Sequence, residues 1–227
     1  MLAFATVVIM GVVVYVFWRE GPLTAVTMFV NLLLAGLVAF NFFEPLADLL
    51  DPIFAGSVVA GYEDGLCLVG LFALTFGLLR LATNSMATTE LEYPGWLLRG
   101  GSVLFGLLTG YLAAGFLVCV LQTLPWQENF LGFNPRYDPD QPLAGARQYL
   151  PPDRVWLALM RYAGAYGFCN HEEYNASDED PPPQRYLTFD RHGSFELRYA
   201  RYRRYAEDAD GPKKYLGEFD QELRPDE

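Results

Sequence analysis

Four residues whose side chains could bind a metal or form a catalytic pair lie together in the C-terminal part of the chain. Cys169 and His171 are followed directly by Glu172 and Glu173. These residue types can bind zinc, and a Cys–His pair can act as nucleophile and base. A structural zinc site, however, takes four ligands in paired spacing, and the next histidine is His192. At i, i+2 the thiol and the imidazole meet in neither a helix nor a strand. We therefore expect neither a metal site nor a catalytic pair here.

The rest of the sequence contains no motif of a common catalytic or cofactor-binding site. It has no P-loop, dinucleotide-binding fingerprint, HExxH or GxSxG pattern. The net charge of −11 at pH 7 also argues against a nucleic-acid-binding protein, which needs a basic surface for the phosphates. We therefore expect a non-enzymatic protein with no cofactor and no nucleic-acid partner.

Charge and hydropathy divide the chain into an apolar front and a polar tail. Residues 1–126 hold only 3 Lys and Arg and 8 Asp and Glu, whereas residues 127–227 hold 13 and 19. The front contains four apolar runs close to the length of about 20 residues that a bilayer-spanning helix needs. We therefore predict an all-α membrane protein with four transmembrane helices, a lipid bilayer around them, and a small, loop-rich C-terminal extramembrane region. The predicted spans are residues 1–18, 23–43, 62–82 and 102–124.

The distribution of arginines predicts how these helices are oriented. The loops after the first and third helices hold Arg19, Arg80 and Arg99, whereas the loop after the second holds carboxylates and no Lys or Arg. Lys and Arg in short loops favour the cytoplasmic side. We therefore predict that both termini lie outside.

Small residues recur at four-residue spacing in the predicted helices. Gly106 and Gly110 form a GxxxG pair in the fourth helix, with Gly115 beyond them, and Ala73 and Gly77 form a similar pair in the third. Small residues let helix backbones approach closely, and such packing drives helix association in lipid. The pairs therefore predict packing within one four-helix unit or, alternatively, a face for self-association.

Asn31 is the polar residue nearest the middle of a predicted span, in the second helix. A proton relay or an ion-coupled transporter normally needs a carboxylate, lysine or histidine at such a depth, and no span has one at its centre. We therefore interpret Asn31 as the donor or acceptor of an interhelical hydrogen bond, with a pore-lining group as the alternative.

Three smaller predictions concern the ends of the second, third and fourth helices. Residues 46–53 are partly apolar and predict a short amphipathic helix on the membrane interface. Glu63 and Asp64 suit the positive end of the third helix dipole. Cys67 and Cys119 are expected to be buried thiols near the same end of their helices, with a disulfide as the alternative if the helices touch.

The tail is predicted to start with a Pro-rich linker, residues 127–152, followed by an extramembrane region, residues 153–227. Pro151, Pro152 and Asp153 predict a helix start with Asp153 as N-cap. This short amphipathic helix would lie on the membrane or pack on the tail. Its apolar face consists of Val155, Trp156, Leu159, Met160 and Ala163.

The later part of the tail alternates apolar and polar residues. Residues 185–199 alternate with period two, which predicts a small hairpin that turns at residues 190–193. Residues 199–205 are compatible with a helix. The arginines among their tyrosines predict contact with anionic headgroups or acidic partners, or else a solvated face paired with acids of the tail itself.

The order of short motifs in the front resembles the colicin V production protein (CvpA) family of bacterial inner-membrane proteins. The similarity covers about residues 1–126 and rests on residues 17–22, 43–50, 78–81 and 99–111. It implies a four-span protein of the bacterial inner (cytoplasmic) membrane with a role in colicin V production, export or envelope upkeep. In such a membrane the outside predicted for both termini from the arginines is the periplasm. The family has no established catalytic residues to carry over. Pro22 departs from the family's usual first turn, and the long tail inherits no role.

Together these observations predict a non-enzymatic accessory or scaffold protein in toxin production, toxin export or envelope maintenance. Its expected partners are the lipid bilayer and either further copies of itself or other membrane and envelope proteins. The alternative is a subunit of a small-solute channel or transporter.

Overall fold

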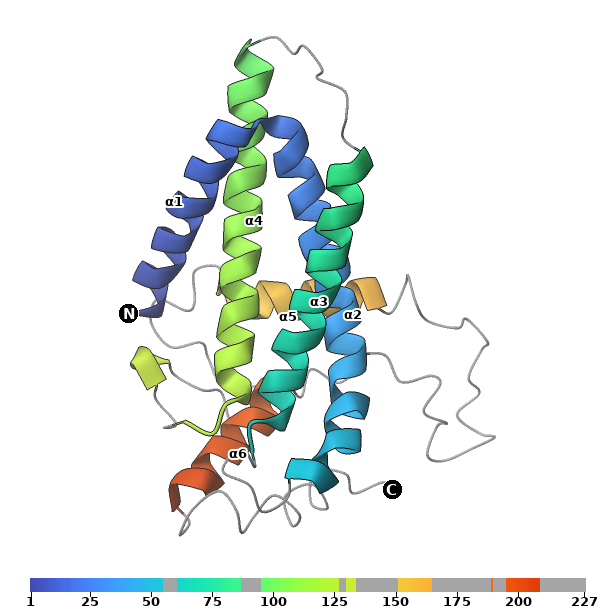
Figure 1. Cartoon of the computed structure of the whole chain (residues 1–227). Helices are drawn as coiled ribbons and strands as arrows, with labels where there is room; N and C mark the ends of the chain where they lie inside the picture. The colour runs from blue at the N-terminus through green and yellow to red at the C-terminus, as the bar shows by residue number, and fades with distance from the viewer. Residues whose placement is uncertain are drawn as a thin grey trace, which may run out of the picture.

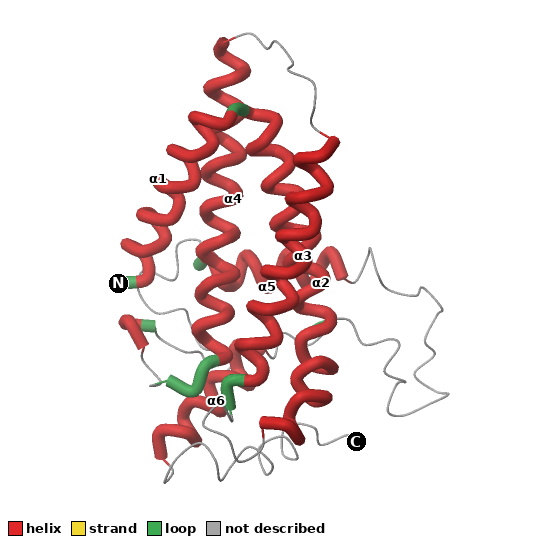
Figure 2. The backbone as a smooth tube through the Cα atoms, viewed as in Figure 1, coloured by secondary structure: helices red, strands yellow, loops and turns green. Residues whose placement is uncertain are grey.

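A computed structural model of the chain describes residues 1–54, 61–86, 95–126, 130–133, 151–164, 189 and 195–208. Within this part of the chain every regular element is a helix (Figures 1 and 2). In chain order the elements are α1 (Leu2–Glu20), α2 (Pro22–Phe54), α3 (Glu63–Met86), α4 (Gly95–Thr123), the 3-10 turn η1 (Phe130–Gly132), α5 (Pro152–Ala163) and α6 (Phe195–Asp208).

Four of these helices are long and apolar enough to cross a membrane, which confirms the predicted all-α fold with four transmembrane helices. The membrane-spanning segments are Leu2–Glu20, Pro22–Leu50, Glu63–Ser85 and Arg99–Thr123. At 1.5 Å of rise per residue, α1 is about 28 Å long, close to the hydrocarbon thickness of about 30 Å. The chain is therefore a multi-pass membrane protein.

The four spans pack in the order α1, α4, α2, α3, so α1 and α3 lie at the two edges (Figure 1). One end of the group carries Arg19, Arg80 and Arg99, and we call it the arginine end. The opposite end carries Glu44 and Asp64 and is called the carboxylate end. Most of the side chains of α1 and α3 are exposed on the outside of the group, where lipid would surround them.

The second span is longer than predicted, because α2 continues to Phe54 and includes the segment expected to form a separate interface helix. Pro45 lies inside it, and a proline removes one backbone hydrogen bond from a helix. The continuation has apolar partners nonetheless, since Phe43 is fully buried and Leu46 and Leu50 pack against the main core. The free energy gained by this packing therefore outweighs the loss of one helical hydrogen bond at Pro45.

The first tail helix forms where the sequence predicts it, but its start differs in detail. Pro151 is the N-cap of α5, and Asp153 lies inside the first turn rather than at the cap. The sequence predicted that this helix would lie on the membrane or pack on the rest of the tail, whereas in the structure it packs on the spans. It crosses α2 and α4 directly (Figure 1).

The hairpin prediction is wrong where the structure describes its residues, because 195–199 belong to helix α6. Phe195, Tyr199 and Arg203 are all buried and follow each other at i, i+4 and i+8, the spacing of one helix face. The apolar residues at period two therefore do not form a strand here. The segment is a helix, and its buried face contacts the membrane domain. Of the remaining hairpin residues only Phe189 lies in the described part of the chain, and it is buried.

The contact between α1 and α4 depends on two of the predicted packing glycines. A Cβ atom added to Gly106 would lie 2.9 Å from Cα of Val14, and one added to Gly110 would lie 2.7 Å from Cα of Met10. Backbone atoms cannot move aside as a flexible side chain can. The two glycines therefore let α1 and α4 touch backbone to backbone within one chain.

We expect Gly110→Ala to reduce the free energy of unfolding by about 1–3 kcal/mol, because the added methyl overpacks this contact. The matched control is Gly70→Ala on α3, where nothing lies within 4 Å of an added Cβ. That change should be neutral or stabilising, since alanine is the better helix former. Equilibrium unfolding by SDS in mixed micelles, followed by circular dichroism, measures both variants. Equal effects of the two substitutions would contradict the proposed contact.

Candidate functional site

The third glycine of the α4 series, Gly115, contacts α5 and not another span. A Cβ atom at Gly115 would lie 2.3 Å from the carbonyl oxygen of Pro152. On the other side, a Cβ atom at Gly36 of α2 would lie 2.4 Å from Cζ2 of Trp156. The two glycines therefore make room for the amphipathic helix. Gly115 was predicted as a packing residue, whereas nothing in the local sequence pattern pointed to Gly36.

The predicted pair on α3 has no partner within the described part of the chain. Ala73 and Gly77 are both exposed, and nothing lies within 4 Å of a Cβ atom built on Gly77. Gly70, one turn earlier, is equally open. Of the predicted small residues, these are the ones that the chain leaves on its outer surface.

Asn31 lies between α2 and α3, where it is 2% exposed. Its side-chain amide donates a hydrogen bond to the hydroxyl oxygen of Thr83 at 3.1 Å. The Thr83 hydroxyl in turn lies within hydrogen-bonding distance of the Leu79 carbonyl oxygen at 2.9 Å, on its own helix. Asn31 therefore makes the interhelical hydrogen bond that the sequence analysis expects.

The tail packs against the spans in a contact that we call the docking junction. It comprises α5, Phe189, α6 and the residues of α2, α3 and α4 that they contact. The Trp156 ring lies 6.0 Å from that of Phe40 and 5.7 Å from that of Phe116, measured between centroids. Phe189 and Phe195 pack on Phe40 at 4.8 and 5.9 Å. An aromatic cluster therefore joins the tail to α2 and α4.

A polar layer borders this cluster at the end of α4. Gln122 Nε2 donates to Asp153 Oδ2 at 2.9 Å, and both residues are buried. Arg203, which is fully buried, donates from its guanidinium to the carbonyl oxygen of Gln122. That carbonyl belongs to the last turn of α4, which has no helical donor left and carries the negative end of the helix dipole. Arg203 of α6 therefore caps α4.

The same guanidinium packs against aromatic rings from the start of the tail. The carbon Cζ of Arg203 lies 5.4 Å from the ring centroids of both Phe130 and Phe133. Phe130 and Phe133 are buried, and together with Val118 of α4 they form a small cluster. The described beginning of the predicted linker is therefore packed on the spans.

Helix α6 is joined to its surroundings by two ion pairs and by the hydroxyl group of Tyr199. Arg154 of α5 pairs with Glu196 at 2.8 Å, so the two tail helices are joined to each other. Arg198 pairs with Glu44 of α2. Arg154 lies outside residues 199–205, so the first pair does not test the prediction for the arginines of that run. Arg203 of that run is buried rather than on a solvated face, and Arg198, next to the run, pairs with the membrane domain.

Tyr199 completes the link to α3. Its hydroxyl donates to Asp64 Oδ2 at 2.7 Å. Asp64 and Glu63 lie in the first turn of α3, as predicted from the helix dipole. Burial, together with the nearby Asp64 carboxylate, raises the pKa of Tyr199 well above its ordinary value of about 10. The phenol therefore stays a neutral donor at physiological pH.

The cysteines take no part in a disulfide within the described residues. Cys67 and Cys119 are both buried thiols, as expected, so the disulfide alternative is not realised. The Cys119 thiol lies 3.8 Å from the carbonyl oxygen of Asp153, at the edge of the docking junction. The cluster of Cys169 to Glu173 lies outside the described residues.

No family model, curated protein or solved structure matches this chain in the comparisons made. The docking junction therefore has to be interpreted from its own chemistry.

We expect Trp156→Ala to lower the free energy of unfolding by about 3–5 kcal/mol, because it empties the space between α2 and α4. Tyr162 on the exposed side of the same helix is 66% exposed, and Tyr162→Ala is the matched control. The control should change stability by no more than about 0.5 kcal/mol. SDS unfolding in mixed micelles measures both. A small loss for Trp156→Ala would show that α5 does not depend on the aromatic cluster.

We also expect the contribution of Tyr199 to be pH-dependent. Because its pKa in the folded protein is raised, the stabilisation is present below the ordinary tyrosine pKa of about 10 and is lost as the pH rises through the folded-state pKa. Tyr199→Phe should cost about 1.5–3 kcal/mol near pH 8, since it removes a hydrogen bond to a carboxylate. The difference from the unmodified chain, measured as unfolding free energies, should stay constant from pH 8 to about pH 10 and shrink above about pH 10. A difference that does not shrink there would contradict the bond.

Proposed function

We propose that the chain is a non-enzymatic scaffold or accessory protein of the bacterial inner membrane that serves in toxin production, toxin export or envelope maintenance. The observation that carries the proposal is the docking junction, which fixes the tail on the spans through a buried aromatic cluster and a buried polar layer. A scaffold needs a defined surface outside the membrane, and a docked tail provides one. The resemblance to the CvpA family supplies the biological setting.

The proposed orientation follows from the difference between the two ends of the spans. All three arginines of residues 1–126 lie at one side and none lies in the loop at the other, and the positive-inside rule assigns the arginine end to the cytoplasm. Both termini, α5 and α6 would then lie on the periplasmic side.

The same residues leave little support for a transporter. Asn31, the polar residue on which that alternative depended, is engaged with Thr83 in the contact between α2 and α3. The buried polar groups Gln122, Asp153 and Arg203 hold the tail in place at the carboxylate end. These contacts hold the helices of the chain in one arrangement, which favours a scaffold over a transporter.

Self-association of the scaffold is proposed to use α3. Gly106, Gly110 and Gly115 are occupied by α1 and α5 within one chain, whereas Ala73 and Gly77 are exposed. Small residues on an exposed helix face allow a second helix to approach closely in lipid. A second copy of the chain would therefore meet the first across α3.

Cysteine crosslinking in native membranes tests this arrangement. In a chain whose own cysteines are replaced by alanine, Ala73→Cys should form disulfide-linked dimers under mild oxidation. Val12→Cys on α1 is the matched control, because Val12 is also exposed and apolar at 58% exposure. Adding Gly77→Leu to the Ala73→Cys chain should reduce the dimers several-fold. A protein that stays monomeric, or that crosslinks equally at both positions, would count against the scaffold.

A further inference from the structure

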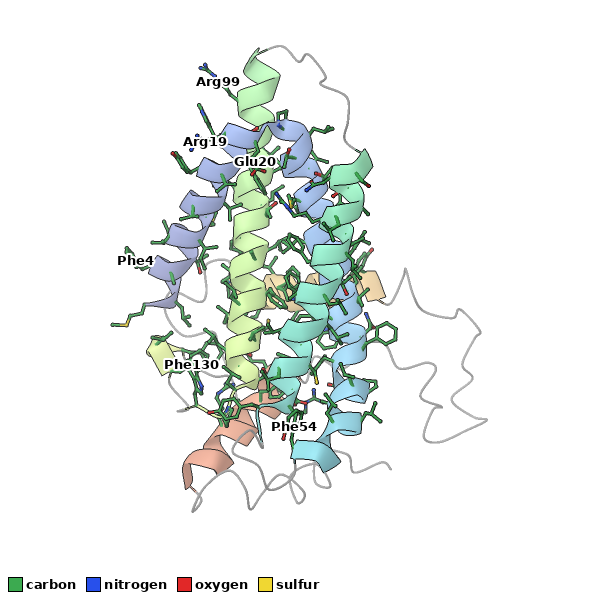
Figure 3. All side chains as sticks on the ribbon, in the orientation of Figure 1. Phe4, Arg19, Glu20, Phe54, Arg99 and Phe130 are labelled. Carbon is green, nitrogen blue, oxygen red and sulfur yellow. The ribbon has the colours of Figure 1, made fainter. Side chains whose placement is uncertain are left out.

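The arginine end carries two arginines from different helices on one corner of the molecule. Arg19 lies in the last turn of α1, and Arg99 lies at the start of the membrane-spanning part of α4. Both side chains are exposed, and Figure 3 shows them projecting from the same end of the structure. The guanidinium carbon of Arg99 lies 5.9 Å from the ring of Trp18, which is itself 53% exposed. We call these three residues the arginine corner.

The backbone contact between α1 and α4 is what brings the two arginines together. α1 and α4 run in opposite directions, and Val14 lies against Gly106. Arg19 follows Val14 by five residues, and Arg99 precedes Gly106 by seven, which corresponds to about 8 and 10 Å along the two helices. The two side chains therefore start from nearly the same level. A looser helix contact would separate them.

Neither arginine of the corner has an anionic partner among the residues that the structure describes. Glu20 follows Arg19 directly, yet no ion pair forms between it and either guanidinium. Arg80, the third arginine of this end, is engaged elsewhere, since its guanidinium reaches the sulfur of Met28 at 3.0 Å. Two like charges on one corner favour an anion that can bind both.

The position of the corner indicates which anion. Arg19 and Trp18 lie at the end of a span about 28 Å long, the depth at which tryptophan meets lipid headgroups. About one and two turns deeper on the same face of α1 as Arg19, the side chains of Val16 and Val12 are exposed at 39% and 58%. An acyl chain can lie on these apolar side chains while its headgroup phosphate contacts the guanidinium groups above.

We propose that the arginine corner binds the phosphodiester of an anionic phospholipid from the adjacent leaflet. The phosphate lies between the guanidinium groups of Arg19 and Arg99, Trp18 packs beside the headgroup, and the acyl chains follow Val16 and Val12 along α1. A zwitterionic headgroup binds more weakly because its ammonium group is repelled by the two guanidinium groups. The inference concerns depth and charge, so it holds whichever side of the membrane the corner faces.

Native mass spectrometry of the detergent-purified chain tests the proposal. The chain is titrated with phosphatidylglycerol and, separately, with phosphatidylcholine, and the first dissociation constant is read from the bound fractions. We expect phosphatidylglycerol to bind at least tenfold more tightly. The double variant Arg19→Gln/Arg99→Gln should lose most of this preference, since each basic residue near an anionic membrane surface contributes a factor of about five.

Arg80→Gln is the control, and the single variants Arg19→Gln and Arg99→Gln are its matched comparison, because each of the three removes one positive charge from the same end but only the latter two remove it from the corner. Arg80→Gln should keep the preference for phosphatidylglycerol, and the thermal midpoint in lipid-free detergent should be unchanged in the double variant. Glycerol phosphate, tested at the same concentration, should not compete with the lipid. Competition by glycerol phosphate, an equal loss in Arg80→Gln, or no preference in the unmodified chain would each overturn the proposal. None of these results depends on self-association or on a scaffold function.

Discussion

The indole of Trp156 lies between α2 and α4, and the carboxylate end is built around it. The side chain is fully buried, with its ring against Gly36 of α2 and its Cβ atom against Gly115 of α4. Phe40 and Phe116 flank the ring, and Phe189 and Phe195 pack on Phe40 in turn. The position of α6 therefore depends on the position of α5. The whole tail contact depends on whether the two spans leave room for one aromatic side chain.

The aromatic and the polar contacts of the tail contribute different amounts of free energy. Burying the aromatic side chains contributes several kcal/mol, whereas a partly exposed ion pair contributes about 0–1 kcal/mol. Arg198 and Glu44 form such a pair, with side-chain exposures of 31% and 41%. The buried contact of Arg203 with the end of α4 differs, because losing it would leave a guanidinium without water in an apolar surrounding. The aromatic cluster thus supplies affinity, and the polar contacts specify one arrangement of α6.

The spans could be predicted from the sequence because a bilayer imposes a local rule, a long run without charges. The docking junction could not, since its partners are far apart along the chain. Gly115 was recognised as a packing residue, but the pattern did not show that its partner is Pro152 in the tail. The sequence allowed a helix over residues 199–205, but the start of α6 was assigned to a hairpin, because apolar residues at period two occur beside the buried set Phe195, Tyr199 and Arg203, whose helical spacing includes an arginine. A pattern search for apolar faces passes over such a residue.

The charged residues at the two ends of the spans have different kinds of partner. At the carboxylate end, Glu44 and Asp64 receive Arg198 and Tyr199 from the chain's own tail. At the arginine end, Arg19 and Arg99 receive no such partner within the described residues, although the Gly106 contact holds their helices backbone to backbone. Charges left on a rigid corner at headgroup depth attract ions from outside the chain. The fold therefore directs one end toward its own tail and the other toward the membrane that surrounds it.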